Sequence, residues 1–177
     1  MKKAHSNGNP EACKYIIKPY NDMEKVAETP VIATPFYKWT LKDRIKQWKG
    51  DEKKIKIFTK RLLTGFAHLH SEAVKMAHRD IKADNILTDN TDDTHPIIID
   101  FGLQNCKNFA SGTEMLLAPE QKGNVNGPFG SPKWWHINGW DHRLVDSWNI
   151  GLVLKSCFEG YETPKGAQDL IEKMTRV

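Results

Sequence analysis

The sequence has no apolar run approaching the roughly 20 residues that cross a membrane, and no apolar stretch follows the two lysines at its start. We therefore expect neither a membrane span nor a secretory signal. The cysteines are few and odd in number, three in all, and no C-x-x-C pair occurs. This pattern predicts free thiols in a reducing compartment, and so an intracellular protein of the cytoplasm or nucleus. A glycine-rich G-x-G-x-x-G motif is absent as well.

The remaining composition is that of one ordinary globular domain. The chain has 177 residues, of which 27% are charged and 39% hydrophobic. This length is enough for one domain with a sizeable hydrophobic core and too short for two domains of ordinary size. The net charge of +4 is modest. It is compatible with an anionic ligand such as a nucleotide, but we expect no nucleic-acid partner.

Two carboxylate-bearing turns stand beside short β-rich runs between residues 77 and 102. The first turn, HRDIKADN, precedes Ile86 and Leu87, and the second, DFG, follows an apolar run at 96–99. The Thr/Asp/Asn-rich stretch between the runs favours a hairpin. Pairing the runs would bring Asp80, Asn85 and Asp100 to one edge of a small sheet. Two carboxylates and an amide oxygen there suit Mg²⁺, which prefers a few protein oxygens plus phosphate oxygens.

These turns, in this order and spacing, resemble the eukaryotic-type protein kinases, whose catalytic loop reads H-R-D-x-x-x-x-N and whose metal-binding turn reads D-F-G. Further on, GTEMLLAPE at 112–120 is similar to the end of the kinase activation segment, with Leu116 where tyrosine is usual. VDSWNIG at 145–151 resembles the buried D-x-W-x-x-G helix, in which the residue matching Asp146 binds the catalytic-loop backbone. The resemblance extends from about Tyr15 to the C-terminus.

The resemblance implies an α+β, protein-kinase-like fold, mostly the helical large lobe with a truncated small lobe of two strands. We expect a single truncated kinase domain at 1–177, with 15–38 as the remnant of the small lobe and hinge and 39–177 as the large lobe. Besides the hairpin, the local patterns predict strands at 15–19 and 31–37, separated by a charged turn at 21–28, and helices at 40–48 and 51–70. The resemblance implies two further helices, at 145–154 and 166–177. Residues 1–10 are expected to be loose.

The resemblance also implies a role for each site residue. Asp80 would accept or orient the proton of the incoming hydroxyl, and Lys82 would place a positive charge beside the transferring phosphoryl group. Asn85 and Asp100 would hold Mg²⁺ against the phosphates of ATP. Leu87 would form the floor under adenine. Lys82 together with Thr113 is similar to the serine/threonine kinases, so the implied function is transfer of the ATP γ-phosphoryl group to a protein hydroxyl.

For each of these residues taken singly, an ordinary turn or core position remains an open interpretation. His78 is expected to pack and to bond the backbone rather than to act as a base. Arg79 marks kinases whose activation segment is ordered by a phosphate, and Ser111 is a candidate acceptor. An exposed loop serine without that role is an equal alternative.

The resemblance stops short at both ends of the chain. Upstream of residue 15 there is no room for a glycine-rich loop, a strand with an ATP-binding lysine, and a full helix with its glutamate partner. We therefore expect ATP to be weakly held and poorly oriented, and activity to be strongly reduced. At the other end, the chain stops before the arginine that pairs with the glutamate matching Glu120.

Two functions remain open from the sequence. One is a serine/threonine protein kinase that uses ATP and Mg²⁺ on a protein substrate. The other is a catalytically impaired, kinase-like regulatory module that binds another kinase or a regulatory protein, or else a fragment of a longer kinase. Small-molecule phosphotransferases share H-x-D-x-x-x-x-N, but A-P-E and D-x-W-x-x-G argue against that class.

Overall fold

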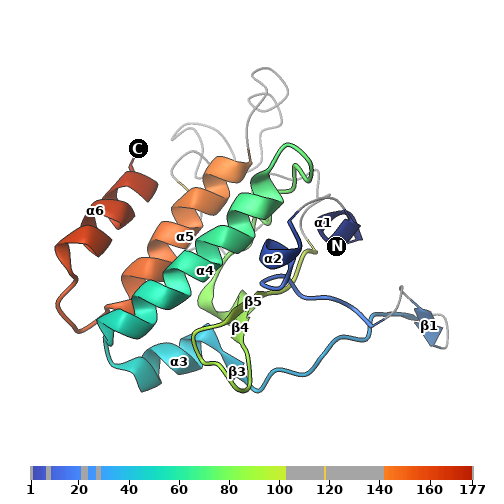
Figure 1. Cartoon of the computed structure of the whole chain (residues 1–177), viewed down its shortest axis with the longest axis horizontal. Coiled ribbons are helices and arrows are strands. Elements are labelled where there is room, and N and C mark those ends of the chain that lie inside the picture. The colour runs from blue at the N-terminus through green and yellow to red at the C-terminus, as the bar shows by residue number, and fades with distance from the viewer. Residues whose placement is uncertain are drawn as a thin grey trace, which may run out of the picture.

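The structure is a computed structural model that describes residues 2–6, 9–20, 24–26, 29–102, 118 and 142–176. Figure 1 shows a helical body crossed by the long helix α4, with α5 and α6 on one side of it and a small sheet on the other. A thin arm that carries β1 projects away from this body. Helices and a three-stranded antiparallel sheet together confirm the expected α+β class.

Helix α4 (Glu52–His70) is the central element of the core. Its N-cap is Asp51, whose Oδ1 accepts a hydrogen bond of 3.1 Å from Lys54 N. Its inner face is a stripe of buried side chains spaced three and four residues apart, Ile55, Phe58, Leu62, Phe66 and Leu69. Each buried side chain of this kind contributes about 1.5–3 kcal/mol. The predicted helix at 51–70 is thus confirmed, together with the face that it buries.

Helix α3 (Leu41–Trp48) begins at the predicted capping box. Asp43 N donates to Thr40 Oγ1 over 3.2 Å, and Thr40 N donates to Asp43 Oδ2 over 3.1 Å. The helix ends where Lys49 adopts the left-handed conformation, with φ at 49°. This sharp end turns the chain from α3 into α4.

The small sheet has the order β3 (Trp39–Thr40), β4 (Ile86–Thr88) and β5 (Pro96–Ile98), all antiparallel. The predicted hairpin is confirmed, with Ile86 opposite Ile98 and Leu87 opposite Ile97. Strand β3 was not predicted, because two residues are too few to show an alternating pattern. Since β3 leads directly into α3, the sheet fixes where that helix starts.

Acidic side chains in the β4–β5 loop join the hairpin to α3 and α4. Asp93 Oδ2 accepts from Lys54 Nζ at 2.7 Å and from Trp48 Nε1 at 3.1 Å. Asp92 Oδ2 accepts from Arg61 Nη1 at 2.7 Å. Burial alone would raise the pKa of Asp93, but the hydrogen bonds from Lys54 and Trp48 outweigh it and lower that pKa.

We expect Asp93→Asn to remove part of the acid sensitivity of the fold. A carboxyl whose pKa is lowered by folding contributes stability above its unfolded value of about 3.9, and this stability is lost as pH falls through the folded pKa. The variant should therefore be less stable than wild type by about 1 kcal/mol at pH 7, and this difference should shrink as the pH is lowered below about 3.9. Urea unfolding midpoints at pH 7 and at lower pH measure this. A difference that stays constant with pH would contradict the assignment.

The strand predictions near the N-terminus are wrong. The two strands found there are β1 (Glu24–Val26), which lies within the predicted turn at 21–28, and β2 (Thr29–Val31), which follows it and pairs with β1 antiparallel. Residues 15–19 form only one parallel bridge, Ile16 to Ile98, with Ile98 N donating to Tyr15 O at 2.8 Å. Tyr15, Ile16 and Ile17 are all buried. Successive side chains of this segment therefore do not alternate between core and solvent, as those of a half-buried strand would. Of the range 31–37, only Val31 lies in a strand.

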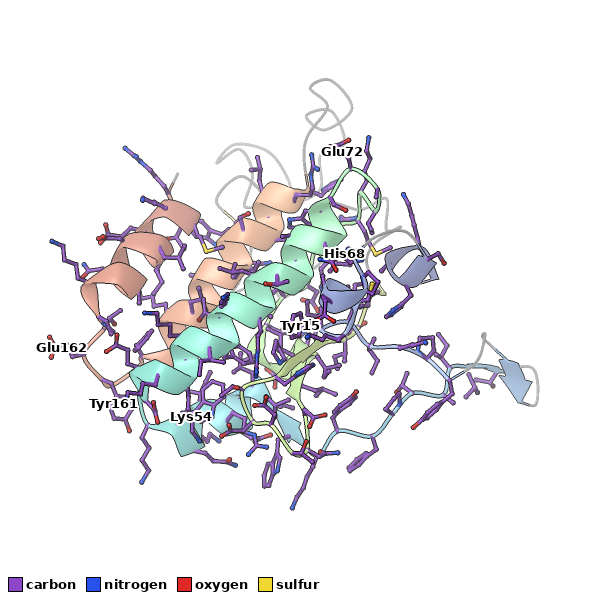
Figure 2. All side chains as sticks on the ribbon, in the orientation of Figure 1. Tyr15, Lys54, His68, Glu72, Tyr161 and Glu162 are labelled. Atoms are coloured by element: carbon purple, nitrogen blue, oxygen red, sulfur yellow. The ribbon has the colours of Figure 1, made fainter. Side chains whose placement is uncertain are left out.

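Two short helices occupy the N-terminal segment that was expected to be loose, α1 (Lys2–Ser6) and α2 (Pro10–Cys13). They are attached to α4 through His68, which Figure 2 labels. His68 Nε2 donates to Ala4 O at 2.7 Å and lies 3.4 Å from Cys13 Sγ. Ala4 and Ala12 are buried as a result. Four- and five-residue helices are too short to give a periodic sequence pattern, so only their contacts reveal them.

Helices α5 (Arg143–Cys157) and α6 (Lys165–Met174) pack against each other and confirm the two C-terminal helix predictions. The close approach explains the glycine of the D-x-W-x-x-G pattern, because a Cβ on Gly151 would lie 2.6 Å from Thr175 Cγ2 and 3.0 Å from Met174 Cβ. In the part of the chain that the structure describes, no helix has both the length and the apolar character to cross a membrane.

Several predictions fall on residues outside the described ranges: Cys106, Ser111, Thr113, Leu116 and Glu120. Ala118 is described and is fully buried. Cys13 and Cys157 are free thiols, as expected. Burial raises the pKa of the Cys157 thiol to about 12, so this cysteine behaves as a core residue.

Candidate functional site

The candidate catalytic loop, residues 78–85, is fastened to α5 by one buried carboxylate. Asp146 is completely buried, and its Oδ2 accepts from His78 N while its Oδ1 accepts from Arg79 N, both at 2.7 Å. These bonds hold Arg79 in a left-handed conformation, with φ at 74°. The expected contact between Asp146 and the loop backbone is thus confirmed. The strained backbone is kept in place because both amides have a charged acceptor.

His70, at the end of α4, supplies a third hydrogen bond to the same carboxylate. Its Nε2 donates to Asp146 Oδ2 over 2.7 Å. Arg143 Nη1, from the first turn of α5, donates to His70 O over 2.9 Å. The end of α4, the loop and α5 therefore meet at one ionic centre. This role of His70 was not predicted from the sequence.

His78 is a packing and backbone-bonding residue, as expected. It is 1% exposed, and its ring lies between those of Phe66 and Phe101, at centroid distances of 6.3 Å and 5.0 Å. Nε2 donates to Ile99 O at 2.7 Å, and Nδ1 accepts from Asp80 N at 3.3 Å. Because both ring nitrogens are engaged, the imidazole ties the loop to the segment that leads into Asp100.

Asp80, Lys82 and Asn85 form a hydrogen-bonded group within the loop. Asp80 Oδ2 accepts from Lys82 Nζ at 2.9 Å and from Asn85 Nδ2 at 3.0 Å. Asn85 Nδ2 also donates to Asp80 O at 2.8 Å. The side chains of Asp80 and Lys82 are 11% and 28% exposed, so a ligand in solvent can reach both. One ammonium and one amide donor on the same oxygen hold the carboxylate in a defined orientation.

Asn85 and Asp100 lie at the same end of the β4–β5 hairpin. Asn85 ends the 3₁₀ turn η1 (Ala83–Asn85), and its carbonyl accepts from Ile99 N over 3.1 Å. Asp100 follows directly, with φ at 62°, and its Oδ1 accepts from Gly102 N over 3.3 Å. The structure therefore brings Asp80 and Asn85 into contact and places Asp100 at the same sheet edge.

The oxygen donors at this edge fit a hard cation. Both described side-chain hydrogen bonds of Asn85 use Nδ2, which leaves Oδ1 as the atom that could bind a metal. The Asp100 carboxylate is on an exposed residue at the same end of the hairpin. Among the described residues, no group of three or more His, Cys, Asp and Glu side chains could hold a metal ion. The donor set at this edge is thus one amide oxygen and one carboxylate, which suits Mg²⁺ completed by phosphate and water.

Leu87 lies on the face of β4 opposite to Ile86 and Thr88. Those two neighbours are buried, whereas Leu87 is only half-buried. An apolar side chain on a partly open sheet face can pack against a flat ring.

The loop is also joined to α3 by an ion pair that was not predicted from the sequence. Lys42 Nζ of α3 lies 3.4 Å from Asp84 Oδ1 in the loop.

Comparison with known proteins gives consistent matches. The model of the protein kinase domain matches residues 5–176. "Probable serine/threonine-protein kinase samkA" of Dictyostelium discoideum is 45% identical over 73 residues, covering 41% of this chain and 11% of that protein. Serine/threonine-protein kinase ksp1 of Schizosaccharomyces pombe is 30% identical over 126 residues, 67% of this chain and 24% of that protein.

Serine/threonine-protein kinase cds1 of Schizosaccharomyces pombe is 38% identical over 113 residues, covering 59% of this chain and 22% of that protein. The chain spans less than a third of the length of each of these three relatives. Each comparison therefore concerns part of a longer protein.

Proposed function

The chain belongs to the protein kinase family, and on that premise we propose that it transfers the γ-phosphoryl group of ATP to a serine or threonine hydroxyl of a protein. The observation that carries the proposal is the hydrogen-bonded group of Asp80, Lys82 and Asn85 at the sheet edge that also holds Asp100. Serine/threonine kinases among the relatives support the class of acceptor. The assignment of 15–38 and 39–177 to two lobes stays a prediction.

Asp80 is the proposed base. Its Oδ2 accepts hydrogen bonds from Lys82 and Asn85, which fix the orientation of the carboxylate. In this orientation the carboxylate would accept or orient the proton of the incoming hydroxyl. Lys82 keeps its ammonium 2.9 Å from that oxygen, where it can also face a transferring phosphoryl group. Because phosphoryl transfer depends mainly on positioning and charge, these two side chains are the proposed catalytic residues.

Asn85 and Asp100 are the proposed holders of Mg²⁺, through Asn85 Oδ1 and the Asp100 carboxylate. When bound, Mg²⁺ would neutralise charge on the ATP phosphates. Leu87 is proposed to pack under adenine from the half-buried face of β4. Asp100 is exposed and has a left-handed backbone with φ at 62°, so a ligand in solvent can reach its carboxylate.

Binding of nucleotide tests this assignment without requiring turnover. A fluorescent ATP analogue is titrated into the full chain with and without Mg²⁺, and wild type should bind more tightly with the ion. Asp100→Asn should lose most of that Mg²⁺-dependent gain, about tenfold or more, because a neutral amide is a much weaker ligand. Asp169→Asn on the exposed face of α6 is the matched control and should behave as wild type.

A kinase-like regulatory module is the second candidate function, favoured by the absence of G-x-G-x-x-G from the sequence. Such a module would bind another kinase or a regulatory protein without transferring phosphate. Titrations in which Mg²⁺ has no effect on nucleotide affinity, in wild type and Asp100→Asn alike, would favour this module over the kinase.

A further inference from the structure

Positive charge is concentrated in one stretch of the chain. Residues 38–61 contain ten Lys and Arg but only three Asp and Glu, whereas the whole chain has a net charge of +4. The remainder of the protein is therefore net acidic. The basic stretch comprises β3, α3 and the first half of α4. A charge asymmetry of this size favours partners of opposite sign at one place on the surface.

The lysines and arginines of α4 form ion pairs on one side of the helix and are exposed to solvent on the other. On the side of the β4–β5 loop, Lys54 pairs with Asp93 and Arg61 pairs with Asp92, each at 2.7 Å. Figure 2 labels Lys54 near the start of this helix. The lysines on the outward side, Lys53, Lys56 and Lys60, are exposed and have no ion pair with a carboxylate of the described ranges.

Ile57 lies in the middle of these outward lysines and is 47% exposed. Lys53, Lys56, Ile57 and Lys60, here called the lysine stripe, are spaced three, four and seven residues apart and so lie on one face of the helix. Like charges one turn apart repel each other and weaken the helix. Glu52 precedes Lys56 by one turn, yet no ion pair within the described part of the chain joins them.

We propose that the lysine stripe binds an acidic peptide segment of a partner protein, with one apolar side chain of the peptide placed on Ile57. The carboxylates of such a segment would neutralise the repulsion among the lysines, and the apolar contact would remove Ile57 from water. From Lys53 to Lys60 the helix rises about 10 Å, which an extended peptide covers in about three to four residues. The expected motif is therefore short, with acidic residues flanking one apolar residue.

The surroundings of the stripe favour a peptide over other anionic partners. The apolar face of α4 is buried in the core, so the helix cannot insert into a bilayer as an amphipathic membrane helix does. The stripe itself contains no aromatic side chain on which bases could stack. Its combination of three cations around one aliphatic residue instead matches an acidic segment with an aliphatic anchor.

The test uses the full chain and a fluorescein-labelled peptide of glutamates and aspartates flanking a single leucine, followed by fluorescence anisotropy. Wild type should bind it, and binding should weaken with salt because the stripe is exposed. The charge-reversed variant K53E/K56E/K60E should lose at least about tenfold in affinity, since three exposed ion pairs become repulsive. Ile57→Ser, or leucine replaced by serine in the peptide, should each weaken binding severalfold.

The matched control is K155E/K165E/K173E, which makes the same change in net charge at exposed lysines of α5 and α6. We expect it to bind within about twofold of wild type. Equal losses in the two triple variants, or no binding by wild type, would overturn the proposal. So would tighter binding of phosphatidylserine vesicles or of short single-stranded DNA through the same lysines. Urea unfolding shows whether both triple variants are folded. If K53E/K56E/K60E does not fold, K53Q/K56Q/K60Q takes its place.

Discussion

Replacing Asp146 by asparagine should lower the free energy of unfolding by about 3 kcal/mol. Asp146 is fully buried and accepts from His78 N, Arg79 N and His70 Nε2, each at 2.7 Å. An asparagine offers one acceptor oxygen and turns an NH₂ group toward the remaining donors. Each buried donor left unsatisfied costs about 1–3 kcal/mol, and the loss of the charge adds to it. Urea unfolding monitored by circular dichroism measures the change.

The control for this substitution is Asp169→Asn on the exposed side of α6, which should change stability by less than about 0.5 kcal/mol. If the Asp146 variant were as stable as this control, the three hydrogen bonds could not be what fixes the loop. A variant that unfolds already in buffer would agree with the expectation and give a lower limit for the loss.

Replacing Asp80 by asparagine should lower the turnover number for phosphate transfer by about 10²–10⁴ while leaving the fold intact. The reason is chemical, because the amide cannot accept a proton, although its oxygen can still accept from Lys82 or Asn85. Transfer of labelled phosphate from ATP with Mg²⁺ to a mixture of serine and threonine peptides measures the rate. Urea unfolding of the same samples separates loss of chemistry from loss of structure.

Asp84→Asn is the matched control, since Asp84 is an acid of the same loop, exposed and paired with Lys42 at 3.4 Å. We expect its rate to stay within about threefold of wild type. Equal losses in the two variants would show that the loop tolerates neither change and would remove Asp80 from its proposed role. No transfer by wild type, under conditions in which nucleotide is bound, would favour the regulatory module.

The parts of the fold that could be predicted are those in which local and tertiary preferences agree. The stripe from Ile55 to Leu69 has helical spacing and a suitable cap at Asp51, so α4 was predicted almost to the residue. The hairpin of β4 and β5 has polar turn residues between two apolar runs. Asp146 could be assigned to the loop backbone only through the resemblance, because 66 or more residues separate it from the amides it binds.

Predictions failed where tertiary packing overrides a local pattern. Residues 15–17 have strand-like composition, but they are buried on all sides and meet β5 at one bridge. The hairpin of β1 and β2 begins in the charged segment at 21–28, whose composition suggests a turn. Likewise, nothing in the sequence pairs His70 with Asp146, since the contact joins residues 76 positions apart and depends on how α4 and α5 pack.

The hydrogen bonds of His78 N and Arg79 N to one buried carboxylate also determine how the loop opens. These two amides can exchange with solvent only when α5 separates from the loop, so their exchange should be as slow as that of the α4 core. Tyr20 N, in contrast, donates to Ala33 O over 2.9 Å on a residue that is 74% exposed, and should exchange rapidly. The backbone at His78 and Arg79 is thus expected to be among the last parts of the described molecule to unfold.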